Sequence, residues 1–349
     1  MSDRELILKQ NPLVNISRST SARMWLVAVC AFLAVLQSGL GDSFLSLIVG
    51  LSVLVSALLT ELLITYKESG FGKIKDGSAA ASALVLALLF PNQIHPVYAA
   101  LSAVFAVAVV KHSFGGLGAN WLNPALGGWL FARFSWPLSF SVALNGSVGK
   151  PDEAGTGLGN MVNAYLNKNI FSVLGAELPS GYIDLFALKT PGIIADRAVL
   201  VLVLAAVVIA ASQISRSWVS FVYLAVFGLL VRVFGNPGSL WNGDVLYAFL
   251  SGGTLAAAFI LISNPSTGAK SASGNLVAAA LAAGLGFVFR FYGQDFFGCL
   301  CAVALVNAVI PLFYKAERRL FYPSSDFVGL AESGIDENGL NDSKERRYE

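Results

Sequence analysis

The chain has 349 residues, of which 56% are hydrophobic and 13% are charged. Both fractions lie far outside the range of soluble globular domains, so this composition predicts a polytopic membrane protein. The formal net charge is only +2, and the basic residues are spread along the whole chain. A spread of this kind excludes the concentrated basic surface that nucleic-acid-binding proteins use.

Apolar runs long enough to approach the ~20 residues that cross a bilayer divide the chain into two groups. The first group comprises residues 24–40, 44–65, 77–90, 94–111 and 119–134. The second group comprises residues 198–214, 217–234, 246–263, 275–292 and 297–314. The sequence therefore predicts an all-α protein with about ten transmembrane helices, five in residues 24–134 and five in residues 198–314.

Three polar segments remain outside the predicted spans. The distribution of Lys and Arg residues predicts the side of the membrane on which each segment lies. Most Lys and Arg residues fall on the side of the N-terminus when the spans are threaded in order, which predicts that this side is cytoplasmic. Residues 1–23 and 315–349 are then cytoplasmic, and residues 135–197 form one large loop on the opposite side. The tail 315–349 has too little apolar surface to fold throughout and is expected to be partly disordered. No cleavable signal peptide is evident, so the first span is expected to be retained.

The two groups of spans contain related segments. Ser82–Asn92, "SALVLALLFPN", is similar to Ala256–Ser266, "AAAFILISNPS", and each run follows a Gly/Ser-rich start, "DGSAAA" or "SGGTLA". A weaker similarity pairs the fifth span with the tenth. Because the offset is five spans, an odd number, the second half must be inverted relative to the first. The sequence predicts two inverted five-helix repeats with broken helices, as in many transporters.

The segment "FGGLGANWLNP", residues 114–124, is rich in helix-breaking residues although it lies among apolar runs. One explanation is a broken helix whose free backbone groups face protein, ligand or water instead of lipid. The alternative is close helix–helix packing through glycine. The Asn-Pro pair favours the broken helix.

Several motifs of the sequence resemble those of a known family. "FGGLGANWLNPALGGWLF", followed by "SWP", is similar to a signature of the family that includes the D subunit of Rnf complexes and the B subunit of the sodium-pumping NADH:quinone reductase. "DGSAAASALVLALLFP", "TPGIIADRA" and "YAFLSGGTLAAAFILISNPST" resemble further parts of it in the same order. The resemblance covers about residues 20–315, and the length is most like that of the Rnf D subunit.

The resemblance implies a redox function. Such subunits belong to an Rnf-type ferredoxin:NAD oxidoreductase of the bacterial inner membrane, which couples electron transfer to Na⁺ or H⁺ translocation. The chain is then expected to be a multi-pass translocase subunit that works with other membrane and redox subunits and is not active alone. The sequence does not distinguish Na⁺ from H⁺.

The resemblance also implies covalently bound FMN, joined through its phosphate to a threonine in the large loop. An alignment without gaps places Thr156 at that position. The surrounding residues depart from the family pattern, because Lys150 replaces an aspartate and "EAG", residues 153–155, replaces Ser-Gly-Ala. The alternative is a glycine-rich turn that carries an ordinary exposed threonine.

A second flavin that is not covalently bound, such as riboflavin, is implied as well. The glycine-rich break before the fifth span is a suitable wall for it. The candidate binding residues are Gly115, Gly116, Gly118, Asn120, Asn123 and Pro124.

Ionisable residues within membrane spans are costly and are therefore candidates for an ion path. Glu61 lies in the second span, and Asp76 and Asp196 lie at span entrances. The alternative for Glu61 is a helix-end carboxylate paired with Lys67, and ordinary solvation is the alternative for the two aspartates. Asn264 stands where the family has an aspartate, so that position offers no carboxylate here.

Other chemistry receives little support. The three cysteines, Cys30, Cys299 and Cys301, lie in spans and are too few for a four-ligand iron–sulfur cluster, and no metal site is expected. A urea- or ammonium-type channel or a solute transporter is the alternative function, because broken helices in inverted repeats also build such proteins. The loop 135–197 favours the redox pump, since a permease has no need of it.

Overall fold

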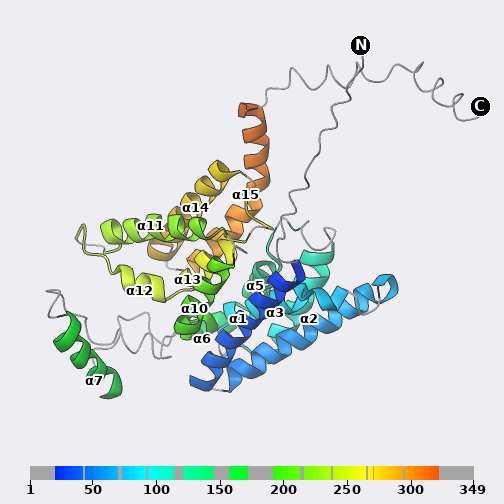
Figure 1. Ribbon diagram of the computed structural model, residues 1–349, viewed down its shortest axis with the longest axis horizontal. Helices are drawn as coiled ribbons and strands as arrows, with labels where there is room; N and C mark the ends of the chain where they lie inside the picture. The colour runs from blue at the N-terminus through cyan, green and yellow to red at the C-terminus, as the bar shows by residue number, and fades with distance from the viewer. Residues whose placement is uncertain are drawn as a thin grey trace, which may run out of the picture.

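The computed structural model describes residues 20–41, 44–69, 73–91, 93–113, 120, 122–144, 157–171, 192–212, 216–236, 239–264, 266–269, 271–293 and 295–321. Within these ranges the regular structure is helical, and the only β-type pairing is an isolated bridge between Pro91 and Ile193. Figure 1 shows the helices of the first half beside those of the second.

The first half consists of long and short helices in alternation. In chain order they are α1 (Thr20–Gly41), α2 (Leu45–Ser69), the 3₁₀ turn η1 (Lys73–Asp76), α3 (Ser78–Leu89), α4 (Pro96–Phe105), the π-helical η2 (Ala106–His112) and α5 (Pro124–Ser135). Four short elements follow: α6 (Pro137–Leu144), α7 (Gly157–Leu166), the π-helical η3 (Asn167–Phe171) and α9 (Ile194–Arg197).

The second half has a similar order of elements. They are α10 (Val199–Ala211), α11 (Ser217–Phe234), α12 (Val245–Leu250), α13 (Thr254–Ala256), the π-helical η4 (Ala257–Ile262), α14 (Ala272–Phe287), the π-helical η5 (Val288–Tyr292) and α15 (Gly298–Phe321).

Several helices are suited to a bilayer. Among the described residues, four helices are long and apolar enough to cross a membrane: Ser21–Leu40, Leu45–Tyr66, Ser217–Phe234 and Ala272–Tyr292. Shorter apolar helices are Ser78–Leu89, Pro96–His112, Val199–Ala211 and Gly298–Phe313. The expectation of an all-helical protein with several membrane-capable helices is therefore confirmed for the described residues, while the ten spans in two inverted repeats stay a prediction.

Helix α3 forms the centre of the first half. Eleven of its twelve residues are buried, as expected of a helix that is apolar all round. It packs against α1, α2 and α5. Helix α1 lines its buried side with Ala28, Ala31 and Ala34, and such small residues allow helices in a membrane to approach closely.

The predicted span 246–263 is not continuous. It is broken between α12 and α13, where Gly252 and Gly253 have φ of 69° and 71°. These left-handed conformations suit glycine, which lacks a Cβ atom. Helix α3 likewise begins directly after a left-handed glycine, Gly77, with φ of 75°. Each half thus contains a short helix that starts at a left-handed glycine.

The two halves contact each other at both backbone and side-chain level. The backbone N–H of Ile194, at the start of α9, donates to the carbonyl of Phe90 at the end of α3, with an N···O distance of 2.9 Å. Arg133 on α5 forms an ion pair with Asp295, just before α15, at 3.0 Å. Helix α1 also packs against α9 and α10.

Candidate ion-path residues at two helix breaks

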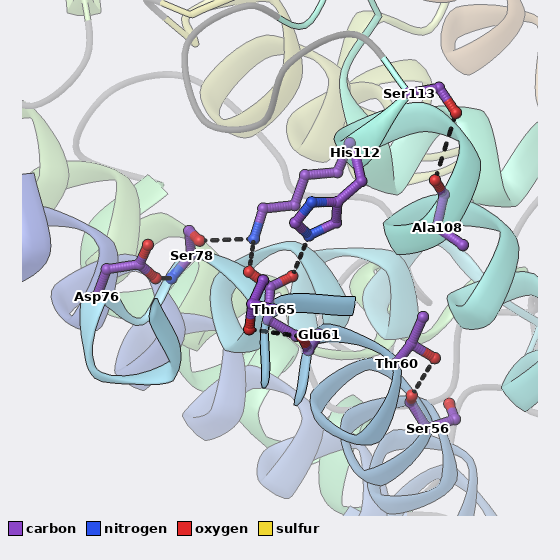
Figure 2. Close-up of polar contacts among 10 residues, drawn as sticks. Ser56, Thr60, Glu61, Thr65, Asp76, Ser78, Ala108, His112 and Ser113 are labelled. Carbon is purple, nitrogen blue, oxygen red and sulfur yellow. Dashed lines mark hydrogen bonds and ion pairs between the residues drawn. The ribbon is translucent and has the colours of Figure 1, made fainter. Parts of the chain in front are cut away.

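Glu61 on α2 is an almost fully buried carboxylate with two nitrogen partners (Figure 2). The Nζ atom of Lys111 donates to Oε1 at 2.8 Å, and Nε2 of His112 lies 2.8 Å from Oε2. The Glu61 and Lys111 side chains are 2% and 3% exposed, whereas that of His112 is 16% exposed. A charge buried to this extent requires partners of this kind, because burial removes its hydration.

Lys111 and His112 are neighbours in sequence and reach the same carboxylate. They close the π-helical segment η2, which continues α4. Adjacent residues on a regular α-helix point in different directions, and a π-helical turn is a local departure from that geometry that is frequent at functional sites. Here the long lysine and the imidazole converge on opposite oxygens of Glu61.

Lys111 also connects Glu61 to the start of α3. Its Nζ donates to Oγ of Ser78, the first residue of α3, at 2.8 Å. The backbone N–H of Ser78 in turn donates to Oδ1 of Asp76 at 2.8 Å (Figure 2). Two of the three predicted ion-path residues therefore belong to one connected group. We call this group the Glu61 cluster; its members are Glu61, Asp76, Ser78, Lys111 and His112.

Asp196, the third predicted ion-path residue, lies at the break of the second half. It is 4% exposed. Its Oδ1 accepts from the N–H of Gly253 at 2.9 Å, and its Oδ2 accepts from the N–H of Ile193 at 3.4 Å. The carboxylate thus stabilises both the start of α9 and the left-handed turn before α13.

Arg290 occupies the other side of this break. Its Nη1 donates to the carbonyls of Ala248 and Ser251 at 2.7 and 2.9 Å and to Oγ1 of Thr254 at 3.0 Å. Its Nη2 donates to Oγ of Ser251 at 2.6 Å. A broken helix leaves carbonyls without intrahelical partners, and this guanidinium satisfies two of them. We call Asp196, Ser251, Gly253, Thr254 and Arg290 the Arg290 cluster.

The residues predicted to line a flavin are only partly described. Asn123 caps α5, because its Oδ1 accepts from the N–H of Ala125 at 3.0 Å, and Pro124 is the first residue of that helix. Asn120 and Asn123 are 8% and 5% exposed. Gly115, Gly116, Gly118 and Thr156 lie outside the described residues.

Sequence reasoning does not identify the basic members of the two clusters. By sequence alone, Lys111 falls in a cytoplasmic connection, His112 has no partner for a metal site, and Arg290 lies beside a span. The available signal is the pair "KH" at the end of the apolar run 94–111, since a lysine in such a place requires a buried partner. The alternative pairing of Glu61 with Lys67 involves a side chain outside the described ones.

Comparison with known proteins finds relatives that match this chain over nearly the whole length of both proteins. The D subunit of the proton-translocating ferredoxin:NAD(+) oxidoreductase complex of Clostridium ljungdahlii is 26% identical over 310 residues, which cover 88% of this chain and 93% of the relative. The D subunit of the Na(+)-translocating ferredoxin:NAD(+) oxidoreductase complex of Acetobacterium woodii is 24% identical over 325 residues, with coverage of 92% and 96%. The D subunit of an ion-translocating oxidoreductase complex of Escherichia coli is 27% identical over 354 residues, with coverage of 90% and 97%.

A family model also matches most of the chain. The model of the NQR2, RnfD, RnfE family matches residues 7–322. This range contains both clusters, the segment 114–124 and the loop 135–197. The chain therefore belongs to the NQR2, RnfD, RnfE family.

Proposed function

We propose that the chain is the D-type membrane subunit of an Rnf-type ferredoxin:NAD oxidoreductase, in which electron transfer drives Na⁺ or H⁺ across the bacterial inner membrane. Relatives matched over nearly their whole length are named as D subunits of proton- or Na(+)-translocating ferredoxin:NAD(+) oxidoreductase complexes. In this role the chain works with other membrane and redox subunits. Both termini are cytoplasmic, and residues 135–197 lie on the opposite side.

The structural observation that carries the proposal is the Glu61 cluster. A carboxylate that is 2% exposed lies among apolar helices and holds a lysine and a histidine at 2.8 Å. Keeping ionisable groups inside a membrane is costly, and they are retained where ions or protons pass. Glu61 is therefore the ion-path residue, while Asp76 and Asp196 hold the two helix breaks in place through backbone N–H groups.

The two clusters also support an inverted-repeat architecture. In each half a left-handed glycine precedes a short helix, and the first residue of that helix binds a basic residue from a π-helical turn. Such matching structures at the starts of related segments are expected when a chain contains two structural repeats. We extend this to ten spans, five in residues 24–134 and five in residues 198–314.

A channel for urea, ammonium or another small solute is the alternative that such breaks also allow. A permease for neutral solutes selects by pore width and by hydrogen-bonding groups. It has no need for a buried carboxylate with two basic partners. Uptake of urea or ammonium by vesicles that contain this chain alone would support the channel and contradict the pump.

A variant of Glu61 tests the pump. Glu61→Gln keeps the size of the side chain and removes its charge, so ion-dependent turnover per assembled complex should fall about tenfold or more while flavin content is unchanged. The measurement is ferredoxin-dependent NAD reduction and ion uptake in membrane vesicles. Thr60→Val is the matched control, because Thr60 is the preceding residue and its hydroxyl donates to the carbonyl of Ser56 on the same helix (Figure 2). Wild-type ion dependence in Glu61→Gln would contradict the role of Glu61.

The second part of the proposal is that FMN is attached to Thr156. Helix α7 begins at Gly157, directly after this threonine, and it has no acidic residue in its first turn. The free N–H groups and the dipole at the amino end of a helix favour a phosphate group. Bound FMN would supply one- and two-electron redox chemistry, and Thr156 would fix its position. The second flavin is proposed to lie beside the segment 114–124, where Asn120 and Asn123 are buried polar residues.

Covalent attachment can be tested on a denaturing gel viewed under ultraviolet light. The chain is expressed with its flavin-attaching enzyme, as wild type, Thr156→Ala and Thr190→Ala. Fluorescence should be retained by wild type and by Thr190→Ala, a threonine of the same loop, and be lost in Thr156→Ala. A dark wild-type band would contradict attachment, and a fluorescent Thr156→Ala band would place the flavin on another residue.

A further inference from the structure

The two carboxylate oxygens of Glu61 have partners of different character. Oε1 accepts from Lys111, whose Nζ is also bound to Ser78 on another helix. Oε2 faces His112, the more exposed of the two basic side chains. Lys111 is therefore buried and bound to both Glu61 and Ser78. The His112 ring contacts this cluster through Nε2. His112 is thus the more exposed of the two basic partners of Glu61.

The charges of the Glu61 cluster leave room for one further cation. Glu61 and Asp76 each carry a negative charge when ionised, and Lys111 carries one positive charge. A neutral His112 leaves one negative charge in excess; Asp76 is half-buried, whereas Glu61 is held away from water, where an unbalanced charge is unfavourable. The excess is removed by a proton on His112 or by a monovalent cation at Glu61. Both together are disfavoured, because two positive charges at one carboxylate oxygen repel each other.

We propose that His112 is the exchangeable partner of Glu61: the transported monovalent cation takes the place of the imidazole at Oε2, while Lys111 remains on Oε1 as a fixed counter-charge. This inference rests on the proposed function and deepens it by naming a positioning residue for the ion site. When a cation binds, the Nε2···Oε2 contact breaks and a protonated His112 releases its proton to water. The charge of the cluster is unchanged in this exchange.

Few of the charged side chains that the structure describes face η2. Among the described side chains of α2, α4 and α5, which pack against η2, the charged ones are Glu61 and Arg133. Arg133 is paired with Asp295 at 3.0 Å. On η2 itself Lys111 is the other charged residue, and Asp76 of η1 is connected through Ser78. Among these described side chains, Glu61 is thus the carboxylate in direct contact with His112.

The Arg290 cluster provides an internal comparison. Arg290 donates to two carbonyls and two hydroxyls, whereas the carboxylate of Asp196 is held by the backbone N–H groups of Ile193 and Gly253. A guanidinium bound in this way has no carboxylate oxygen to exchange. The cation exchange is therefore confined to the first half.

The test measures turnover of the complete complex in membrane vesicles against Na⁺ concentration, with choline chloride keeping ionic strength constant, between about pH 5.5 and 7.5. Histidine side chains change charge in this range. In wild type the Na⁺ concentration for half-maximal turnover should rise about tenfold at the lower pH, because proton and cation compete. His112→Gln keeps a hydrogen-bond donor that does not titrate, so this value should be independent of pH.

His95→Gln is the matched control, because His95 is the other of the two histidines and caps α4; it should behave as wild type. His112→Asn is the second variant if Gln impairs assembly. A wild-type rise that persists in the His112 variants would overturn the inference.

If turnover does not depend on Na⁺ at all, the cation is H⁺. Turnover of the His112 variants should then no longer change with pH in this range. A pH dependence that is retained in these variants would contradict the exchange. Loss of ion dependence in Glu61→Gln together with an unchanged His112→Gln would reject this inference and leave the proposed function intact.

Discussion

Ser78 and Thr254 occupy matching positions in the two halves of the chain. Each is the first residue of a short helix that follows a left-handed glycine, and each hydroxyl oxygen accepts from a basic residue of a π-helical turn. The distances are 2.8 Å from Lys111 to Ser78 and 3.0 Å from Arg290 to Thr254. The two sites differ in the other partners of the cation, which include Glu61 in the first half and, in the second, two backbone carbonyls and the hydroxyl of Ser251.

This difference predicts strong coupling between Glu61 and Lys111. Glu61→Gln removes the carboxylate that pairs with the buried ammonium of Lys111, and Lys111→Met removes the ammonium from the buried carboxylate of Glu61. Breaking a buried ion pair by removing one partner lowers the free energy of unfolding by about 3–5 kcal/mol, whereas removing both charges is often nearly neutral. The double variant should therefore be at least as stable as either single variant.

The measurement is a double-mutant cycle of unfolding in mixed detergent micelles. Thr60→Val, which leaves both charges in place, gives the background effect of a substitution in this part of α2. Additive effects of Glu61→Gln and Lys111→Met would show that the two side chains do not stabilise each other.

The left-handed glycine before α13 gives a second prediction. Gly253→Ala should lower the free energy of unfolding by about 2 kcal/mol, because a left-handed conformation alone costs a non-glycine residue about 1–2 kcal/mol. An added Cβ would also lie 2.9 Å from Cδ1 of Ile193. Gly284→Ala is the matched control: it lies inside α14, nothing lies within 4 Å of its added Cβ, and alanine should stabilise the helix by about 0.5–1 kcal/mol.

Thermal unfolding of the two purified variants separates these effects. Equal midpoints for Gly253→Ala and Gly284→Ala would mean that the break tolerates a side chain. Residue 253 could then adopt another backbone conformation and still donate its N–H to Asp196.

The helix positions were largely predictable from the sequence, because runs of apolar residues identify helices that must be buried or face lipid. The predicted span 217–234 coincides with α11 (Ser217–Phe234). The span 246–263 is instead broken, since a run of apolar residues does not show that Gly252 and Gly253 adopt left-handed conformations. The sequence similarity of "DGSAAA" to "SGGTLA" nevertheless indicated that the two short helices begin in related ways.

The composition of the candidate site was less predictable. The cost of a charge in a membrane span identified Glu61, but its partners Lys111 and His112 are 50 and 51 residues away in sequence. Which cation reaches a buried carboxylate depends on how α2 packs against η2. Sequence periodicity contains no information on that packing.

The ion pair between Arg133 and Asp295 gives a third prediction. It joins α5 to the turn before α15, and its side chains are 21% and 27% exposed, so it should contribute only about 1 kcal/mol. Asp295→Asn removes the charge but can retain the hydrogen bond that Oδ1 accepts from the N–H of Phe297 at 3.1 Å. Asp295→Ala removes both and should be less stable than Asp295→Asn by about a further 1 kcal/mol. Equal unfolding midpoints for the two variants would contradict a role for the Phe297 hydrogen bond.

The final prediction concerns the orientation of the chain in the membrane. Lys75 lies on the side where α1 begins, because its carbonyl accepts from Oγ of Ser21 and Nε1 of Trp25, both at 3.0 Å. Ser141, an exposed residue of α6, belongs to the predicted non-cytoplasmic segment 135–197. A membrane-impermeant maleimide should label Ser141→Cys in intact cells and label Lys75→Cys only after the membrane is opened.

The wild-type chain is the control for this labelling, because its cysteines are fully or partly buried. The opposite labelling pattern would place every segment between spans on the other side of the membrane, because the side of one segment fixes the sides of all the others. It would place Thr156 on the cytoplasmic side. The contacts within the two clusters would be unaffected, because they depend on helix packing and not on the direction in which the bundle crosses the bilayer.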